Sequence, residues 1–293
     1  MSSPLLSSLL TLLESGVDLG VTACLIALLV LHRDSVKLHW RRGLVVGLLV
    51  LGVVVPQNLT TIFYISPDRM VGDLGPQGLE EIMEGAALAG VIIGATVGTA
   101  ARVIWYTVIT CVVVAEWQRL RPDAPLLGQA LLARARARPL ALALGMGLLA
   151  GALSAWIFDL IQVDMGQAIE LLQEYFPGLA ESSAGTRVLV ALPLGVYAAL
   201  VEELVFRGAL LGFLLRVGRE RRWVVLASSV VTSLTWALLH LSVTDMPLVK
   251  LTQIFLIGLG LAAIARRWGI EAAILAHLGL NLAGLAGMLV LGS

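Results

Sequence analysis

Long apolar stretches separated by short polar segments make up most of this chain. An α-helix needs ~20 residues to cross the hydrocarbon layer of a membrane. Eight stretches approach or exceed this length, and they cover 10–31, 43–65, 86–115, 139–160, 187–215, 223–241, 248–265 and 270–291. The pattern predicts an all-α, polytopic membrane protein with about eight transmembrane helices.

The composition agrees with this pattern. Hydrophobic residues make up 58% of the chain and charged residues only 14%, whereas soluble domains have roughly 45–50% and about 25%. Cys24 and Cys111 each lie in an apolar segment and predict neither a disulfide framework nor a metal knuckle. No basic patch carries interleaved aromatic residues, so we expect the lipid bilayer to be a partner and nucleic acid not to be one.

Basic residues are concentrated in alternate connections. The connections after the first, third, fifth and seventh predicted helices contain Arg33, Lys37, Arg41, Arg42, Arg119, Arg121, Arg134, Arg136, Arg138, Arg216, Arg219, Arg221, Arg222, Arg266 and Arg267. Cytoplasmic loops of membrane proteins are enriched in Lys and Arg. We therefore expect a multi-pass protein of the inner or plasma membrane with these connections in the cytoplasm and both termini outside. His32 and His39 lie in the first basic connection and are predicted to be solvated or at the lipid headgroups.

The chain divides into two predicted parts. Residues 1–160 would form four N-terminal helices, and residues 187–291 would form a catalytic core of four helices, joined by the acidic outer connection 161–186. In the third helix, Gly90, Gly94 and Gly98 form two consecutive GxxxG steps, which let another helix approach closely. We interpret this stripe as intramolecular packing, with a homo-oligomer as the alternative.

Most of the polar and charged residues that interrupt apolar segments lie in the last four predicted helices. Glu202, Glu203 and Arg207 interrupt the apolar segment 187–215. A charge at the centre of a membrane helix costs ~2.5–3.5 kcal/mol, so such residues pair with each other or face a wet cavity. Glu203 and Arg207 are four residues apart and share a helix face, which predicts an intrahelical ion pair. Glu202 points about 100° away and is available for another role.

Two later helices carry polar pairs at the same spacing. Trp236 and His240 are four residues apart, and so are His277 and Asn281. His240 lies near the end of 223–241, whereas His277 lies near the start of 270–291. Because these two helices run in the same direction, the histidines meet only if the helices are offset or tilted.

A cavity lined by these side chains would support hydrolysis. A glutamate can act as a general base on water, and a histidine can share that water or protonate the leaving amine. A second histidine and an asparagine amide can donate hydrogen bonds to the oxyanion. We therefore select Glu202, His240, His277 and Asn281 as candidate catalytic residues.

The motifs Glu202-Glu203-x-x-x-Arg207, Trp236-x-x-x-His240 and His277-x-x-x-Asn281 resemble those of the CAAX protease and bacteriocin-processing family. This is the Abi, or type II CAAX prenyl endopeptidase, group of intramembrane proteases. The resemblance covers about 187–291. It departs from the family at Trp236, where Phe is usual, which affects the expected pocket size rather than the chemistry.

The resemblance implies an intramembrane endopeptidase acting on a membrane-associated peptide or protein. It implies that Glu202 activates water with help from His240, and that His277 and Asn281 stabilise the oxyanion. Glu203 and Arg207 would brace the site. A composition rich in Ala, Leu, Gly and Arg is typical of a bacterium with a GC-rich genome, where the family is associated more with bacteriocin immunity and processing than with prenylated proteins. We therefore assign no CAAX substrate.

Several alternatives remain open at this point. Zinc held by Glu202, His240 and His277 is possible only if the helices converge closely, and we favour metal-free activation of water without a cofactor. A membrane immunity or scaffold protein of the same fold would need no catalysis. A proton-coupled transporter would favour repeated halves and broken helices in matching positions, and the sequence contains neither.

Overall fold

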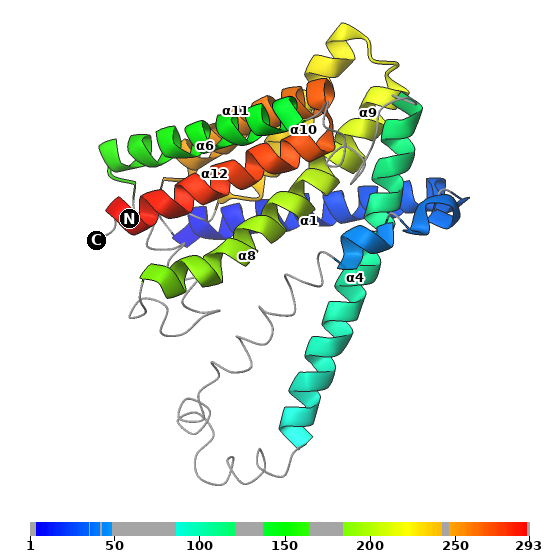
Figure 1. The fold of residues 1–293 in the computed structure, drawn as a ribbon, viewed down its shortest axis with the longest axis horizontal. Coiled ribbons are helices and arrows are strands. Elements are labelled where there is room, and N and C mark those ends of the chain that lie inside the picture. The colour runs from blue at the N-terminus through cyan, green and yellow to red at the C-terminus, as the bar shows by residue number, and fades with distance from the viewer. Residues whose placement is uncertain are drawn as a thin grey trace.

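The structure is a computed structural model that describes residues 4–34, 36–41, 43–48, 86–120, 137–163, 184–241 and 246–291. The elements considered below (Figure 1) are α1 (Pro4–Leu31), α4 (Ala86–Leu120), α6 (Ala137–Leu160), α8 (Ala184–Glu202), the π-helix η2 (Glu203–Leu211), α9 (Gly212–Val217), α10 (Arg222–Leu238), α11 (Pro247–Trp268) and α12 (Ile270–Leu291). The described residues contain helices and no strand, so the predicted all-α class is confirmed.

Four of the described helices are long and apolar enough to cross a membrane. They are Gly98–Leu120, Ala137–Leu160, Pro247–Trp268 and Ile270–Gly287. Residues 43–48 of the predicted second helix are helical, and the rest of that segment lies outside the described residues, as does most of the connection 161–186. The chain is thus a multi-pass membrane protein, while the count of eight spans stays a prediction.

The last helices of the chain pack together with α6 from the first half. Helix α6 lies along α12, α10 packs against α11, and α8 packs against α12 (Figure 1). A single residue, Gly269, joins α11 to α12, and its φ of 102° is a conformation that glycine adopts easily. Helix α4 contacts η2 and α9. Two helices of the first half therefore support the elements that carry the motifs.

Glycines set the close approach of α6 and α12. A Cβ atom added at Gly147 would lie 1.8 Å from the carbonyl oxygen of Ala276, and one added at Gly151 would lie 2.5 Å from that of Leu280. From the other side, a Cβ at Gly279 would lie 2.6 Å from the Leu144 carbonyl oxygen. Small residues at four-residue spacing allow helix backbones to touch in membranes. This contact holds α12 in place immediately beside His277.

The stretch from α8 to α9 is one continuous helix with an irregular centre. Its regular α-helical bonding gives way to a π-helix at Glu203 and returns at Gly212. π-Helices are rare and occur often at functional sites. In η2 every residue except Leu210 is buried, including Glu203 and Arg207. The wider turn therefore coincides with the first motif.

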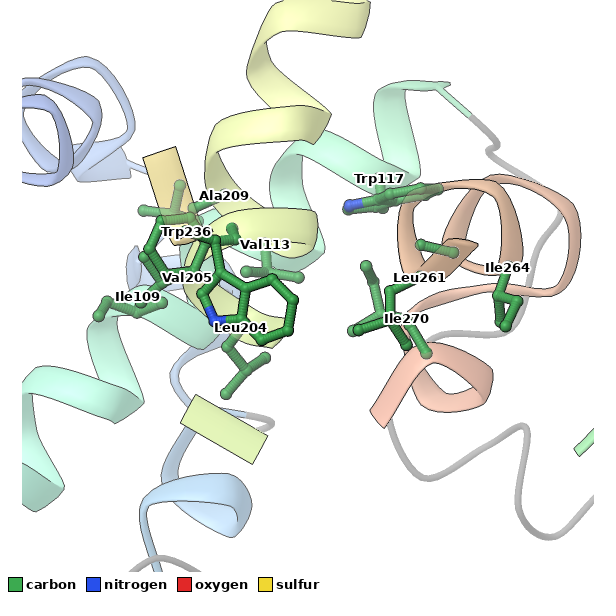
Figure 2. Packing of buried hydrophobic residues seen from close by; sticks show 14 of the residues in the cluster. Ile109, Val113, Trp117, Leu204, Val205, Ala209, Trp236, Leu261, Ile264 and Ile270 are labelled. Carbon is green, nitrogen blue, oxygen red and sulfur yellow. The ribbon is translucent and has the colours of Figure 1, made fainter. Parts of the chain in front are cut away.

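Trp117 and Trp236 are the largest fully buried side chains of the described core. Figure 2 shows both among apolar side chains, with Val113 of α4 and Leu204 of η2 in the same cluster as Trp236. The Trp117 indole N–H donates to the backbone carbonyl of Gly208 at 3.0 Å. A bond of this kind ties α4 to the π-helix.

The prediction that His32 is solvated or at the headgroups is wrong. Its side chain is buried, and its Nε2 atom pairs with the buried carboxylate of Glu116 in α4. Arg216 of α9 pairs with the same carboxylate, its Nη2 atom lying 3.1 Å from Oε1. The sequence alone misplaced His32 because Glu116 is 84 residues away. His39 is half-buried and has an interaction of its own.

The predicted helix-contact stripe is only partly described. The surroundings of Gly90 and Gly94 lie outside the residues whose side chains the structure describes. A Cβ atom added at Gly98 would meet nothing within 4 Å. A homo-oligomer through this stripe stays a prediction.

Candidate active site

The two adjacent glutamates of the first motif face different surroundings. Glu203 is fully buried at the start of η2, where Oε1 accepts a hydrogen bond from Nη1 of Arg207 at 3.1 Å. Glu202, the last residue of α8, keeps 24% of its side chain exposed. The predicted ion pair between Glu203 and Arg207 is confirmed, and Glu202 is the accessible carboxylate of the motif.

His277 lies between the two carboxylates. Its Nδ1 atom is 2.9 Å from Oε1 of Glu203, and its Nε2 atom is 3.9 Å from Oε2 of Glu202. Because the Arg207-paired carboxylate of Glu203 is an acceptor, Nδ1 carries the proton of the neutral ring. Nε2 therefore presents its lone pair toward Glu202.

His240 approaches Glu202 in the same way. It lies just beyond the end of α10, where its Nδ1 atom is 2.9 Å from the carbonyl oxygen of Trp236. A carbonyl only accepts, so the proton of the neutral ring is on Nδ1. Nε2 then faces Oε2 of Glu202 at 4.0 Å. The structure thus brings both histidines to one oxygen atom, and the offset of α10 and α12 that the sequence required is present.

Trp236 has a closer role than the sequence indicated. Its indole N–H donates a hydrogen bond to Oε2 of Glu202. The Arg207 guanidinium lies over the indole ring, with Cζ 4.2 Å from the ring centroid, which is a cation–π contact. The His240 and His277 rings meet the indole edge-to-face at centroid distances of 5.4 and 5.3 Å. Trp236 therefore contacts all three motifs.

Gly258 of α11 closes the site behind Arg207. A Cβ atom added there would lie 2.8 Å from Cβ of Ser233 and 3.0 Å from Nη2 of Arg207. Nη2 and Nε of Arg207 have no hydrogen-bond partner among the described residues. The Arg207 guanidinium is held by its hydrogen bond to Glu203, by its contact with the Trp236 indole and by close packing against Gly258.

Asn281 lies one turn beyond His277 and contacts α8. Its amide nitrogen donates to the backbone carbonyl of Gly195 at 3.0 Å, and a Cβ at Gly195 would lie 3.4 Å from the Cβ atom of Asn281. No described contact joins Asn281 directly to Glu202. Its predicted part in oxyanion stabilisation stays a prediction, and its observed contact ties α12 to the helix that carries Glu202.

The structure also shows contacts between the two halves at residues that the sequence did not single out. The Nζ atom of Lys250 in α11 lies 5.3 Å from the ring centroid of Phe158 in α6. The hydroxyl oxygen of Tyr106 in α4 lies 2.8 Å from that of Tyr197 in α8. A lone lysine or tyrosine in an apolar helix was the only signal that the sequence offered for them.

Residues 184–283 match the family model described as Rce1-like, type II CAAX prenyl endopeptidase. This segment is an Rce1-like domain. The family resemblance predicted from the three motifs is therefore confirmed. Comparison with the curated proteins and comparison with solved structures gave no match. The Rce1-like domain spans α8 to α12 and contains all the motif residues, whereas Tyr106, Glu116 and α6 lie outside it.

The family match also bears on the class of protein. The match of residues 184–283 to a type II CAAX prenyl endopeptidase model indicates a protease of the membrane. The division into residues 1–160 and 187–291 stays a prediction, although the contacts of α4 and α6 show that the first half packs directly on the domain.

Proposed function

We propose that this protein is an intramembrane endopeptidase in which Glu202 activates a water molecule, assisted by His240 and His277. The observation that carries the proposal is the convergence of both imidazole Nε2 atoms on Oε2 of Glu202, at 4.0 and 3.9 Å. These separations exceed a direct hydrogen bond and leave room for a water molecule that donates one hydrogen bond to Glu202 and its other hydrogen bond to one of the two imidazole Nε2 atoms, each at ~2.8 Å. Partial exposure of Glu202 and His240 leaves the water accessible to substrate.

The reaction follows from these positions. Glu202 takes a proton from the water while the water oxygen attacks the peptide carbonyl carbon. Trp236 holds the carboxylate by its N–H, and Glu203 holds His277 in the tautomer whose lone pair faces the water. Collapse of the tetrahedral intermediate breaks the C–N bond, and the amine leaves with the proton from Glu202. General acid–base catalysis of this kind contributes roughly 10²–10⁴ in rate.

The spacing supports water rather than zinc at this position. Ligand atoms bonded to zinc at ~2.0–2.2 Å lie ~3.4 Å apart in a tetrahedral site, which is closer than the separations from Glu202 to His240 and His277. No group of three or more His, Cys, Asp or Glu side chains in the described ranges has the arrangement of a metal site. We therefore derive no step through a metal.

The test uses the full chain in proteoliposomes with internally quenched peptides, one ending in a prenylated CAAX sequence and one an unprenylated apolar peptide. We expect cleavage of at least one peptide by the wild type, and loss of cleavage in Glu202→Gln. Glu220→Gln is the matched control, since Glu220 is exposed in the turn between α9 and α10. Cleavage that persists in Glu202→Gln, or a wild type that cleaves neither peptide, would reject the proposal and favour an immunity or scaffold protein.

Metal dependence is tested on the same preparation. We expect the purified wild type to contain no stoichiometric zinc by elemental analysis and to keep its activity in a zinc chelator. Zinc at one equivalent, lost in the His240→Ala variant together with activity, would replace the metal-free mechanism by a metallopeptidase.

A further inference from the structure

One edge of the Arg207 guanidinium is buried without a hydrogen-bond partner. Nη1 of Arg207 bonds the Glu203 carboxylate at 3.1 Å, whereas Nε and Nη2 have no partner in the part of the chain that the structure describes. Nε and Nη2 lie on the same edge of the planar guanidinium, so a single oxygen atom can accept a hydrogen bond from both. Buried donors are almost always bonded to protein or to ordered water. This edge of Arg207 therefore requires an acceptor.

Ser233 of α10 provides a second buried polar atom beside this edge. Its side chain is fully buried, and its Oγ atom has no hydrogen-bond partner among the described residues. Oγ of Ser233 and Nη2 of Arg207 each lie 3.0 Å from the position that a Cβ atom of Gly258 would occupy. The two atoms are therefore close together without a direct hydrogen bond, within the span of one water molecule bonded to each at ~2.8–3.0 Å.

The surroundings of Arg207 and Ser233 limit what can bridge them. The Trp236 ring lies against the guanidinium, with Cζ 4.2 Å from the ring centroid. On the side of α11, a Cβ atom at Gly258 would lie only 2.8 Å from Cβ of Ser233, so this helix offers no side chain. Glu203 already balances the buried charge of Arg207, and a further anion would bring an uncompensated charge into the core. A neutral acceptor of the size of water meets these conditions.

We propose that one buried water molecule bridges Arg207 and Ser233, and that Ser233 is thereby a positioning residue for the active site. The water oxygen accepts from Nε and Nη2 of Arg207 and donates to Oγ of Ser233. Buried waters of this kind bond two to four otherwise unpartnered polar groups. The positioning role rests on the proposed endopeptidase function, whereas the water site can be detected without catalysis.

The bridge acts on the site through a short series of contacts. Oε1 of Glu203 accepts from Nη1 of Arg207 and lies 2.9 Å from Nδ1 of His277. A guanidinium bonded on two edges holds this oxygen in one place, and the oxygen in turn holds the His277 ring with Nε2 toward Glu202. Ser233 thus supports the orientation of His277 without touching the substrate.

The water site is tested by a crystal structure of the full chain, grown in a lipidic mesophase at a resolution that shows ordered water. We expect density for one water within ~3.2 Å of Oγ of Ser233 and of Nε or Nη2 of Arg207. The same density should be lost or displaced in Ser233→Ala. A direct bond between Oγ and Nη2, or no oxygen atom at this edge of Arg207, would overturn the water site whether or not the protein is active.

The positioning role of Ser233 is tested in the proteoliposome assay with the quenched peptide that the wild type cleaves. We expect Ser233→Ala to reduce kcat by roughly 2–10-fold with KM unchanged, the factor for the loss of one hydrogen bond. Ser233→Cys keeps the size and a weak hydrogen-bonding group, so its kcat should lie between those of wild type and Ser233→Ala. Thr232→Val is the matched control, because the buried Thr232 hydroxyl already bonds the backbone carbonyl of Ser228 at 2.9 Å.

The outcomes of this assay separate the two proposals. Wild-type kcat in Ser233→Ala, with Glu202→Gln inactive, overturns the positioning role of Ser233 and leaves the proposed function intact. Equal losses of kcat in Ser233→Ala and Thr232→Val overturn it as well, since any buried hydroxyl of α10 would then have the same effect. A wild type that cleaves no peptide overturns the proposed function and the positioning role together, and the crystal structure still decides the water site.

Discussion

Nδ1 of His277 lies 2.9 Å from Oε1 of Glu203, and this contact orients the imidazole between two neighbouring carboxylates. The buried Glu203 defines which ring nitrogen carries the proton, and the accessible Glu202 faces the other nitrogen. Glu203 thus orients His277, and Glu202 lies opposite the other ring nitrogen at 3.9 Å. Two adjacent residues can face different surroundings because consecutive helical residues point about 100° apart.

We predict that Glu203→Gln strongly destabilises the fold. Glu203 and Arg207 are both fully buried, and removing one partner of a buried ion pair costs about 3–5 kcal/mol because the other charge loses its partner. Thermal or denaturant unfolding in detergent measures the change. The double variant Glu203→Gln with Arg207→Met removes the stranded charge and should recover part of the loss. Wild-type stability of the single variant would contradict a buried charged pair.

We predict that Trp236→Phe keeps the fold and reduces activity. Phenylalanine retains an aromatic face for Arg207 but has no N–H for Glu202. A hydrogen bond to a charged group is worth about 1.5–3 kcal/mol, so kcat/KM should fall by roughly 10–100-fold. The matched control is Trp117→Phe, which loses a bond to the backbone carbonyl of Gly208 rather than to Glu202 and should affect stability more than kcat/KM. Equal activity of Trp236→Phe and wild type would show that the indole only packs.

We predict that Gly147→Ala separates α6 from α12. The added Cβ atom would lie 1.8 Å from the carbonyl oxygen of Ala276, the residue that precedes His277. Because the obstacle is backbone, we expect a loss of at least about 1–3 kcal/mol, the range for overpacked cores, together with reduced activity. Gly145→Ala is the control, since its Cβ would meet nothing within 4 Å. Similar unfolding midpoints for the two variants would refute the close contact.

We predict that Gly258→Ala lowers both kcat and stability. Its Cβ would press on Nη2 of Arg207 and on Ser233, and Arg207 supports Glu203 and the Trp236 ring. A shift of Arg207 would disturb His277 through Glu203, so kcat should fall while KM changes little. Gly260→Ala, in the same helix with open space around its Cβ, should behave as wild type. If both variants have wild-type kcat, the packing of Gly258 against Arg207 does not affect catalysis.

We predict that Glu116→Gln loosens the first half of the chain from the Rce1-like domain. The Glu116 carboxylate pairs with both His32, the residue that follows α1, and Arg216 of α9. Its neutral amide would leave Arg216 without a charged partner. Because the Arg216 side chain is 30% exposed, we expect a loss smaller than the about 3–5 kcal/mol of a fully buried pair. The measurement is the unfolding midpoint together with the rate of limited proteolysis between α4 and α6. Unchanged values for both would show that the cluster does not contribute to stability.

The sequence by itself determined the membrane class, the helical segments that the structure describes, and the family motifs. It also predicted the Glu203–Arg207 pair. These features depend on local order: apolar length decides whether a segment can span the bilayer, and a four-residue spacing places two side chains on one helix face. Nothing beyond neighbouring residues is needed to infer them.

Only the tertiary structure decided how the motif residues use their polar atoms. The bond from Trp236 to Glu202, that from Asn281 to Gly195 and the pairing of His32 with Glu116 join residues 34, 86 and 84 positions apart. A single sequence carries no periodic signal for such contacts, since they depend on the crossing and offset of separate helices. The π-helix at the first motif was likewise not predicted, and η2 packs against α4, α8, α10 and α12.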